Sequence, residues 1–197
     1  MLLLVCGSSC SGKTTALARL GGVDGLVVHD FDEAGVPSDA DTAWRQRTLD
    51  SWVRHAFELE AEGLDVLLAG QSPVGEALAV PSAGLISGMA VCLLDVSEAT
   101  RRERLRQRDS TTCSAAEIED FVEWGRWHRG HAAEPTHQPE VITVRGWDEM
   151  RWDRWSGWSA DDPRWTVTIM DTSEQSVSDT VTAMSVWIRT ARNRPLV

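Results

Sequence analysis

The feature that most constrains this chain is an eight-residue stretch near its N-terminus that runs Gly-Ser-Ser-Cys-Ser-Gly-Lys-Thr. It occupies 7–14 and has the spacing G-x-x-x-x-G-K-[ST], in which glycines let the backbone wrap closely around a phosphate. Its neighbours fit that use, because 2–6 is a wholly apolar run typical of a buried parallel strand and 15–20 begins a helix. Successive amides and the helix N-terminus supply positive potential. The stretch therefore predicts a strand, a phosphate-binding P-loop and a helix in that order.

Two side chains at the end of this loop carry the chemistry that the motif predicts. Lys13 is expected to reach the β- and γ-phosphates of a nucleotide, and the Thr14 hydroxyl is expected to hold Mg²⁺. Lys13 is also the only lysine of the chain, which favours a site that needs a compact ammonium among phosphates. The residues predicted to contact the nucleotide are Gly7, Ser8, Ser9, Cys10, Ser11, Gly12, Lys13, Thr14 and Thr15.

Composition is that of an ordinary globular protein, and 197 residues are enough for one domain with its own core. We therefore expect a single domain over 1–197. The formal net charge of −11 argues against a dedicated nucleic-acid binder, which usually has a basic surface. Cysteines without a C-x-x-C pair predict reduced thiols in a cytoplasmic protein. We expect neither a signal peptide nor a membrane span, since no stretch approaches ~18 consecutive apolar residues.

An acidic pair follows the second predicted strand, 25–29. Asp30 and Asp32 frame Phe31 at the carboxyl end of that strand, where ligands bind in open α/β sheets. Alternate residues of an extended segment point the same way, so both carboxylates are expected to face the γ-phosphate. One would hold Mg²⁺, and the other would accept a proton from an attacking hydroxyl. The alternative is a polar loop whose acids cap the next helix.

The third and fourth predicted strands, 64–69 and 89–94, end differently. No acid stands at the tip of the third, where Gln71 offers an amide to a substrate hydroxyl or phosphate, or is a plain turn residue. Asp95 follows the fourth strand. Between the acidic pair and the third strand, 44–59 has the apolar spacing of a long helix capped by Asp39 or Asp41. Between the third and fourth strands, 74–79 is expected to form a short helix.

An arginine-rich helix follows Ser97, which is placed to cap it. Arg101, Arg104 and Arg108 share one face at steps of three and four. Such a stripe beside phosphates would neutralise charge that develops during phosphoryl transfer, whereas the alternative is a solvated helix. The polar residues 109–113 that follow are expected to be mobile.

The last third of the chain is dominated by tryptophan. The helix expected over 115–131 carries Arg126, a candidate contact to substrate or phosphate, and histidines whose spacing matches no zinc site. A strand is expected over 139–144. The tryptophans of 147–165 favour a local core over an aromatic wall for a flat or sugar-like substrate. A final strand over 165–170 and a helix over 177–188 complete the α/β pattern.

These motifs together resemble the nucleoside-monophosphate-kinase-like group of P-loop kinases. Among them the shikimate kinase, gluconate kinase and chloramphenicol phosphotransferase types look nearest. The resemblance implies a three-layer sandwich with a five-stranded parallel sheet, ordered 2-3-1-4-5, and a lid. It implies Asp30 near Mg²⁺, Asp32 on the acceptor hydroxyl and a lid arginine matched by Arg104 or Arg108. It also places Thr172 in the adenine-contacting loop. The lid and the tryptophan-rich insertion would span about 104–165.

We therefore expect an ATP- and Mg²⁺-dependent kinase that phosphorylates a hydroxyl of a small molecule. Its catalytic residues would be Lys13, Asp32, Arg104 and Arg108. A nucleotide or nucleoside kinase is the nearest alternative. An NTP-hydrolysing ATPase or switch would use Asp95 as its Walker B acid, and a binding module would hold ATP without turnover. No nucleic-acid or membrane partner is expected, and a homodimer is left open.

Overall fold

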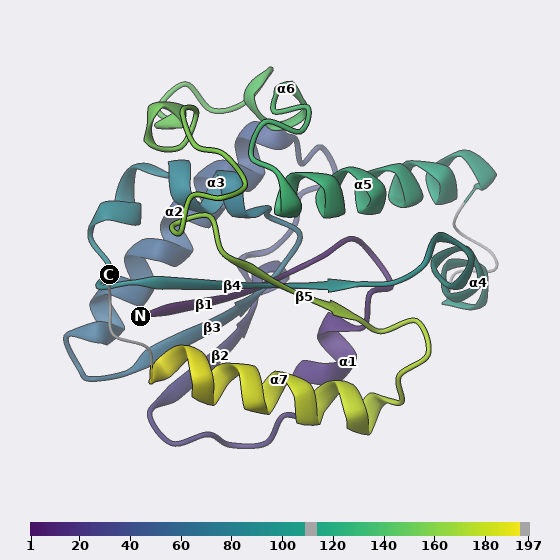
Figure 1. The fold of residues 1–197 in the computed structure, drawn as a ribbon, viewed down its shortest axis with the longest axis horizontal. Coiled ribbons are helices and arrows are strands. Elements are labelled where there is room, and N and C mark those ends of the chain that lie inside the picture. The colour runs from purple at the N-terminus through teal and green to yellow at the C-terminus, as the bar shows by residue number, and fades with distance from the viewer. Residues whose placement is uncertain (109–113, 194–197) are drawn as a thin grey trace.

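The computed structural model describes residues 1–108 and 114–193, and the stretch 109–113, expected to be mobile, lies outside them. Its centre is a five-stranded parallel sheet in the order β2-β3-β1-β4-β5, which confirms the predicted fold class and strand order (Figure 1). The strands are β1 (Leu2–Cys6), β2 (Leu26–Asp30), β3 (Asp65–Ala69), β4 (Met89–Asp95) and β5 (Val167–Asp171).

Strand β1 lies in the middle of the sheet, and all five of its residues are buried. It pairs with β3 from Leu2 opposite Val66 and with β4 from Leu2 opposite Met89. A strand covered on both faces and both edges exposes no side chain to water, which is why its sequence is a continuous apolar run. The P-loop, which follows the carboxyl end of β1, therefore lies at the centre of the end of the sheet where all five strands finish.

Helices cover both faces of the sheet (Figure 1). One face carries α1 (Lys13–Leu17) and α7 (Val177–Arg192), while α4 (Glu98–Arg108) lies beyond the carboxyl end of β4. The other face carries α2 (Thr42–Glu60), α3 (Val74–Ala79), α5 (Ala115–Ala133) and α6 (Glu140–Thr143). Short 3-10 turns complete the chain: η1 (Phe31–Ala34), η2 (Pro81–Gly84) and η3 (Trp152–Arg154). No helix in the described ranges combines the length and apolarity that crossing a membrane requires.

Helix α2 buries two polar side chains that apolar periodicity does not identify. Asp41 caps it, with its carboxylate accepting from the Trp44 amide at 2.6 Å, but Trp44 itself is only partly buried. The inward positions include Gln46 and Asp50, whose side chains have buried partners in Glu76 and Ser82. Because these polar side chains are satisfied, they can face the interior, and an apolar periodicity does not count them.

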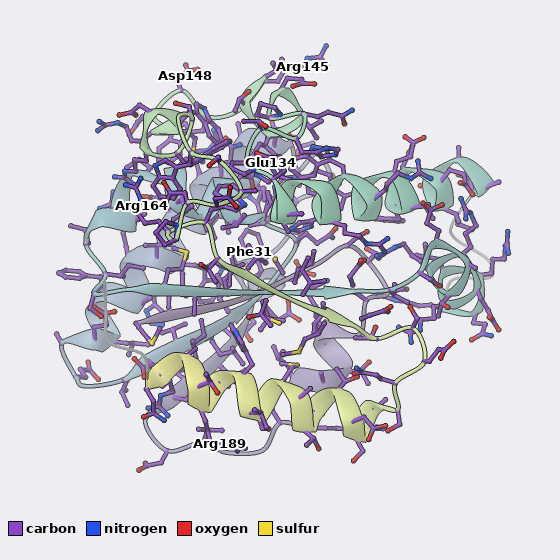
Figure 2. All side chains as sticks on the ribbon, in the orientation of Figure 1. Phe31, Glu134, Arg145, Asp148, Arg164 and Arg189 are labelled. Atoms are coloured by element: carbon purple, nitrogen blue, oxygen red, sulfur yellow. The ribbon has the colours of Figure 1, made fainter. Side chains whose placement is uncertain are left out.

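The tryptophan-rich segment is a local core, as expected. Trp155 and Trp165 are 3% and 4% exposed, and Trp147, Trp152 and Trp158 pack partly buried around them. Figure 2 shows Asp148 of this segment and Arg145, which precedes it, at the outer surface, whereas Phe31 lies in the interior.

The prediction of a strand over 139–144 is wrong. These residues form the short helix α6, preceded by Pro139 in a right-handed helical conformation with φ −62°. Proline suits a helix start, where its missing N–H is not needed. Only Ile142 of this apolar stretch is fully buried, while Val141 and Val144 are exposed.

Trp155→Phe tests the local core. The Trp155 indole donates to the Gly75 carbonyl at 2.8 Å in a buried setting, so its loss leaves that carbonyl unsatisfied. We expect the free energy of unfolding, measured in urea by circular dichroism, to fall by about 1–3 kcal/mol. Trp158→Phe, at a partly buried position, is the matched control and is expected to lose less than half as much. Equal losses would contradict the core assignment.

Candidate functional site

The loop between β1 and α1 has a backbone that its two glycines make possible. A Cβ on Gly7 would come within 2.3 Å of the Leu94 carbonyl oxygen and 2.8 Å of the Ser11 hydroxyl. Gly12 has φ +97°, a conformation that side chains disfavour. The loop therefore makes the tight turn that the motif predicts for a phosphate-binding loop.

Lys13 folds back over this loop. Its ammonium donates to the Gly7 carbonyl at 2.6 Å, to the Ser8 carbonyl at 3.1 Å and lies 3.4 Å from the Ser11 hydroxyl. Burial lowers the pKa of Lys13 to about 8 and outweighs the opposing charges of Asp30 and Asp32. A negative charge added beside this amine would therefore raise its pKa again.

Asp30 and Thr14 meet beside Lys13. The Thr14 hydroxyl donates to the Asp30 carboxylate at 3.2 Å. The other carboxylate oxygen accepts from the Asp32 amide at 3.2 Å, so Asp30 also caps η1 and its orientation is held from both sides. A hydroxyl and a carboxylate are the hard oxygen donors that Mg²⁺ prefers when most other positions go to phosphate and water. This pair fits the predicted metal ligands.

Asp32 is exposed and lies in η1. The expectation that Asp30 and Asp32 share an extended segment is wrong, because Phe31–Ala34 turns as a 3-10 helix. Partial desolvation by the neighbouring chain and repulsion from Asp30 raise the pKa of Asp32, although its side chain reaches solvent, against the opposing charges of Lys13 and Arg108. The carboxylate thus remains in electrostatic range of both cations of the candidate site.

A cavity of about 540 Å³ opens beside the P-loop. Arg104 and Arg108 of α4 line it together with Lys13 and Thr14. Its other lining residues are Cys10, Gly12, Thr15, Ala16, Thr172, Gln175, Val177 and Thr180. Of the last three, Gln175 precedes α7 and the other two lie in its first turn; sequence analysis missed all three as site residues, because they look like ordinary cap and helix-face residues.

Two arginines on one face of α4 have different roles. Arg101 is 1% exposed and donates to the Ser9 carbonyl at 2.6 Å and to Asp95 at 3.1 Å. Arg104 donates to the Cys10 carbonyl at 3.2 Å and the Thr172 carbonyl at 2.8 Å while it lines the cavity. One arginine therefore supports the loop from behind, and the next reaches its ligand side.

Asp95 and Thr172 also make hydrogen bonds to other parts of the protein. Asp95 is buried and receives hydrogen bonds from Arg101 and Arg129. The Thr172 hydroxyl lies 3.0 Å from the Ser11 carbonyl and 3.0 Å from the Asp95 carbonyl. Thr172 therefore joins the end of β5 to the P-loop.

The two predicted acceptor contacts lie outside this cavity. Gln71 is exposed just after β3. Arg126 is exposed on α5 and donates to Glu98 at 2.8 Å. The structure thus gathers the nucleotide-binding and metal candidates at one place but does not bring Gln71 or Arg126 into the lining of the cavity.

The histidines of α5 are buried. His131 packs against tryptophan rings, including Trp127 at 4.8 Å between ring centroids. Burial lowers the pKa of His131 to about 4 and the pKa of His128 well below its usual value. Within residues 1–108 and 114–193, no group of three or more His, Cys, Asp or Glu side chains is arranged to hold a metal ion.

No sequence profile of a known family matches the chain, and no curated protein matches it by sequence. Solved structures do match its fold. A sugar kinase from Janibacter sp. HTCC2649 has a TM-score of 0.57 at 13% identity, covering 95% of this chain and 94% of its own. Shikimate kinase from Aquifex aeolicus has a TM-score of 0.50 at 13% identity, covering 98% of each chain.

The YorR protein of Bacillus subtilis, solved in complex with phosphorylated GDP, is also similar, with a TM-score of 0.58 at 11% identity over 99% of each chain. At these identities the likeness is one of fold. The chain has the fold of small-molecule P-loop kinases, and the predicted resemblance is confirmed at that level.

The lowered pKa of Lys13 predicts proton uptake on nucleotide binding. Above pH 8 the amine is largely neutral, and bound phosphates would restore its charge, so binding at pH 8.5–9 should take up a proton. Calorimetry with ATP in buffers of different ionisation enthalpy measures this uptake. Lys13→Arg is the control, because arginine keeps its proton throughout. Equal uptake in both proteins would contradict the assignment to Lys13.

Proposed function

We propose that this protein is an ATP- and Mg²⁺-dependent phosphotransferase that moves the γ-phosphate of ATP to a hydroxyl of a small molecule. The observation that supports it most is the contact of Thr14 with Asp30 at 3.2 Å, directly beside Lys13 and at the cavity. The fold shared with a sugar kinase and a shikimate kinase makes a phosphotransferase the expected class.

In this proposal the cavity holds the nucleotide. Amides of 7–15 and the Lys13 ammonium bind the phosphates, because each presents a donor or a positive charge to them. Arg104 and Arg108 lie along the same cavity and would neutralise charge on the transferred group. Thr172 and Gln175 mark the part of the cavity nearest α7, which we assign to the nucleoside.

Thr14 and Asp30 would hold Mg²⁺, which supplies charge neutralisation between the phosphates when bound. The contribution of the chain is to fix these two oxygen ligands before the metal arrives. The Asp32 amide and the N-terminus of η1 hold Asp30 from one side, and Thr14 holds it from the other.

Asp32 would orient the acceptor hydroxyl and accept its proton. The raised pKa makes this carboxylate a better proton acceptor than an ordinary aspartate. Most of the catalysis would come from positioning and electrostatic neutralisation, as phosphoryl transfer requires.

The remaining assignments concern the acceptor. We keep Gln71 as a candidate contact, because it stands exposed at the carboxyl edge of the sheet. Arg126 stays a weaker candidate, since Glu98 engages it. A nucleotide or nucleoside kinase would use the same arrangement with another acceptor. An ATPase that used Asp95 is disfavoured, because two arginines occupy that carboxylate.

The test is release of ADP from ATP·Mg²⁺, alone and with a panel of nucleosides, nucleoside monophosphates, sugars, sugar acids and hydroxyl-bearing antibiotics. Release that rises with one acceptor class supports the proposal and identifies the acceptor. Release indifferent to every acceptor supports an ATPase, and ATP binding without release supports a binding module.

Asp32→Asn tests the assigned base. We expect acceptor-dependent turnover to fall ~100-fold or more, because the amide cannot accept the proton, while ATP affinity changes little. Asp39→Asn, in the exposed loop before α2, is the matched control and should keep full turnover. An Asp32→Asn protein with normal turnover would contradict the role given to Asp32.

A further inference from the structure

The cavity beside the P-loop has a cationic part and a neutral part. Lys13 of the P-loop and Arg104 and Arg108 of α4 make up the cationic part. The lining residues from the loop after β5 and the first turn of α7 carry no charge: Thr172, Gln175, Val177 and Thr180. Phosphates need cations, whereas a nucleobase is neutral, so a nucleotide in this cavity would place its nucleoside against the neutral part.

Thr172, the residue expected to contact adenine, is already engaged by the protein. Its hydroxyl lies 3.0 Å from the Ser11 carbonyl and 3.0 Å from the Asp95 carbonyl, and it accepts from Arg104 at 3.3 Å. The Thr172 backbone carbonyl also accepts from Arg104, at 2.8 Å, and only 3% of the residue is exposed. The Thr172 hydroxyl therefore has its donor and acceptor capacity used within the protein.

Gln175 keeps hydrogen-bonding capacity for a ligand. Its amide oxygen accepts from the hydroxyl of Thr180 at 3.2 Å. Within residues 1–108 and 114–193, its Nε2 amino group donates to no other residue. The side chain is exposed and lines the cavity, so a ligand there would meet an amide whose two N–H donors are still available.

The backbone that carries Gln175 is held on both sides. The hydroxyl of Ser173, two positions before it, accepts from the Ser97 amide at 2.8 Å. Ser176, directly after it, caps α7, and its hydroxyl accepts from the Asp179 amide at 3.1 Å. The amide is thus presented from a fixed segment, which lowers the ordering cost of a contact with a ligand.

The surroundings of Gln175 suit a flat ring with polar edges. Val177 of α7 and Ala16 of α1 line the same cavity and offer apolar surface to the faces of a ring. The ring nitrogens of adenine are acceptors, and an acceptor removed from water without a donor costs free energy. Gln175 can supply that donor.

We propose that Gln175 reads the base of the bound nucleotide by donating its Nε2 amino group to a ring nitrogen of adenine, and that Thr180 is the positioning residue that holds the amide for this contact. This inference rests on the proposed function. An amino group matches an acceptor nitrogen, whereas a carboxylate in the same place would repel it. The neutral part of the cavity then recognises the nucleoside independently of the phosphates.

The first experiment compares AMPPNP with tripolyphosphate, which has the phosphates but no nucleoside. Calorimetry with Mg²⁺ gives the two dissociation constants, and their ratio measures the preference for the nucleoside. We expect Gln175→Glu to lower this preference at least tenfold, because an acceptor replaces the donor, and Gln175→Met to lower it by less. Gln107→Glu is the matched control, because it adds the same charge at an exposed position of α4 outside the cavity lining. It should keep the wild-type preference.

The second experiment tests Thr180. Thr180→Val removes the hydroxyl that holds the Gln175 amide and should lower the preference for AMPPNP at least threefold, whereas Thr180→Ser keeps the hydroxyl and should keep the preference. Thr182→Val is the matched control: its hydroxyl makes the same kind of bond to the helix backbone, to the Ser178 carbonyl at 2.9 Å, but it does not line the cavity. Circular dichroism verifies that each variant folds.

The outcomes separate the two proposals. If AMPPNP and tripolyphosphate both bind but the preference is absent, is unchanged in both Gln175 variants, or rises in Gln175→Glu, the inference is overturned and the proposed function stands. Equal losses in Thr180→Ser and Thr180→Val overturn the positioning role. If Thr180→Val does not fold, the exposed Gln175 decides the inference through its own variants. If neither compound binds the wild-type protein, the proposed function fails, and this inference fails with it.

Discussion

Three successive carbonyl groups of the P-loop are held from outside the loop, and the site depends on this constraint. Arg101 binds the Ser9 carbonyl, Arg104 the Cys10 carbonyl and Thr172 the Ser11 carbonyl. These contacts fix the orientation of the three peptides and with it the directions of their amides, of which that of Ser11 donates to the Ser8 carbonyl at 3.3 Å within the loop. Under the proposed function, a loop fixed in this way would need little reordering to bind phosphate, which lowers the ordering cost of binding.

Asp95 connects these supports. Its carboxylate receives Arg101 and Arg129, and its backbone carbonyl accepts from the Thr172 amide at 2.8 Å. One residue at the end of β4 therefore fixes α4, α5 and the end of β5 relative to the loop. A buried carboxylate between two guanidinium groups is a structural hub, and removal of Asp95 would take from the buried Arg101 guanidinium the carboxylate that it binds. This explains why an acid at a strand tip beside the P-loop need not bind the metal.

Much of the fold could be predicted because its signals are local. Local sequence alone determines three of these signals: the apolar run of β1, the glycines of the P-loop and the acid at the end of β2. Thr14 and Asp30, which the sequence predicts to share a site, lie 3.2 Å apart. The predicted relation of Asp32 to Asp30 is wrong, because the chain turns directly after Asp30, and the carboxylate that caps this turn looks in sequence like part of an extended segment.

The elements that sequence reasoning missed depend on partners far along the chain. Gln46 faces inward only because Glu76 and the backbone near 142–147 satisfy it. Arg45 and Glu76 are 31 positions apart, and no periodicity relates an exposed-looking arginine on one helix to a glutamate on another. Gln175 and Thr180 reach the cavity because β5 ends beside the P-loop. This proximity follows from the strand order and cannot be predicted from the residue types.

The candidate site concentrates positive charge locally. Lys13, Arg104 and Arg108 line one cavity beside the P-loop, within a chain whose formal net charge is −11. A net negative charge disfavours the approach of anions, so binding of a nucleotide at this cavity would depend on that local field.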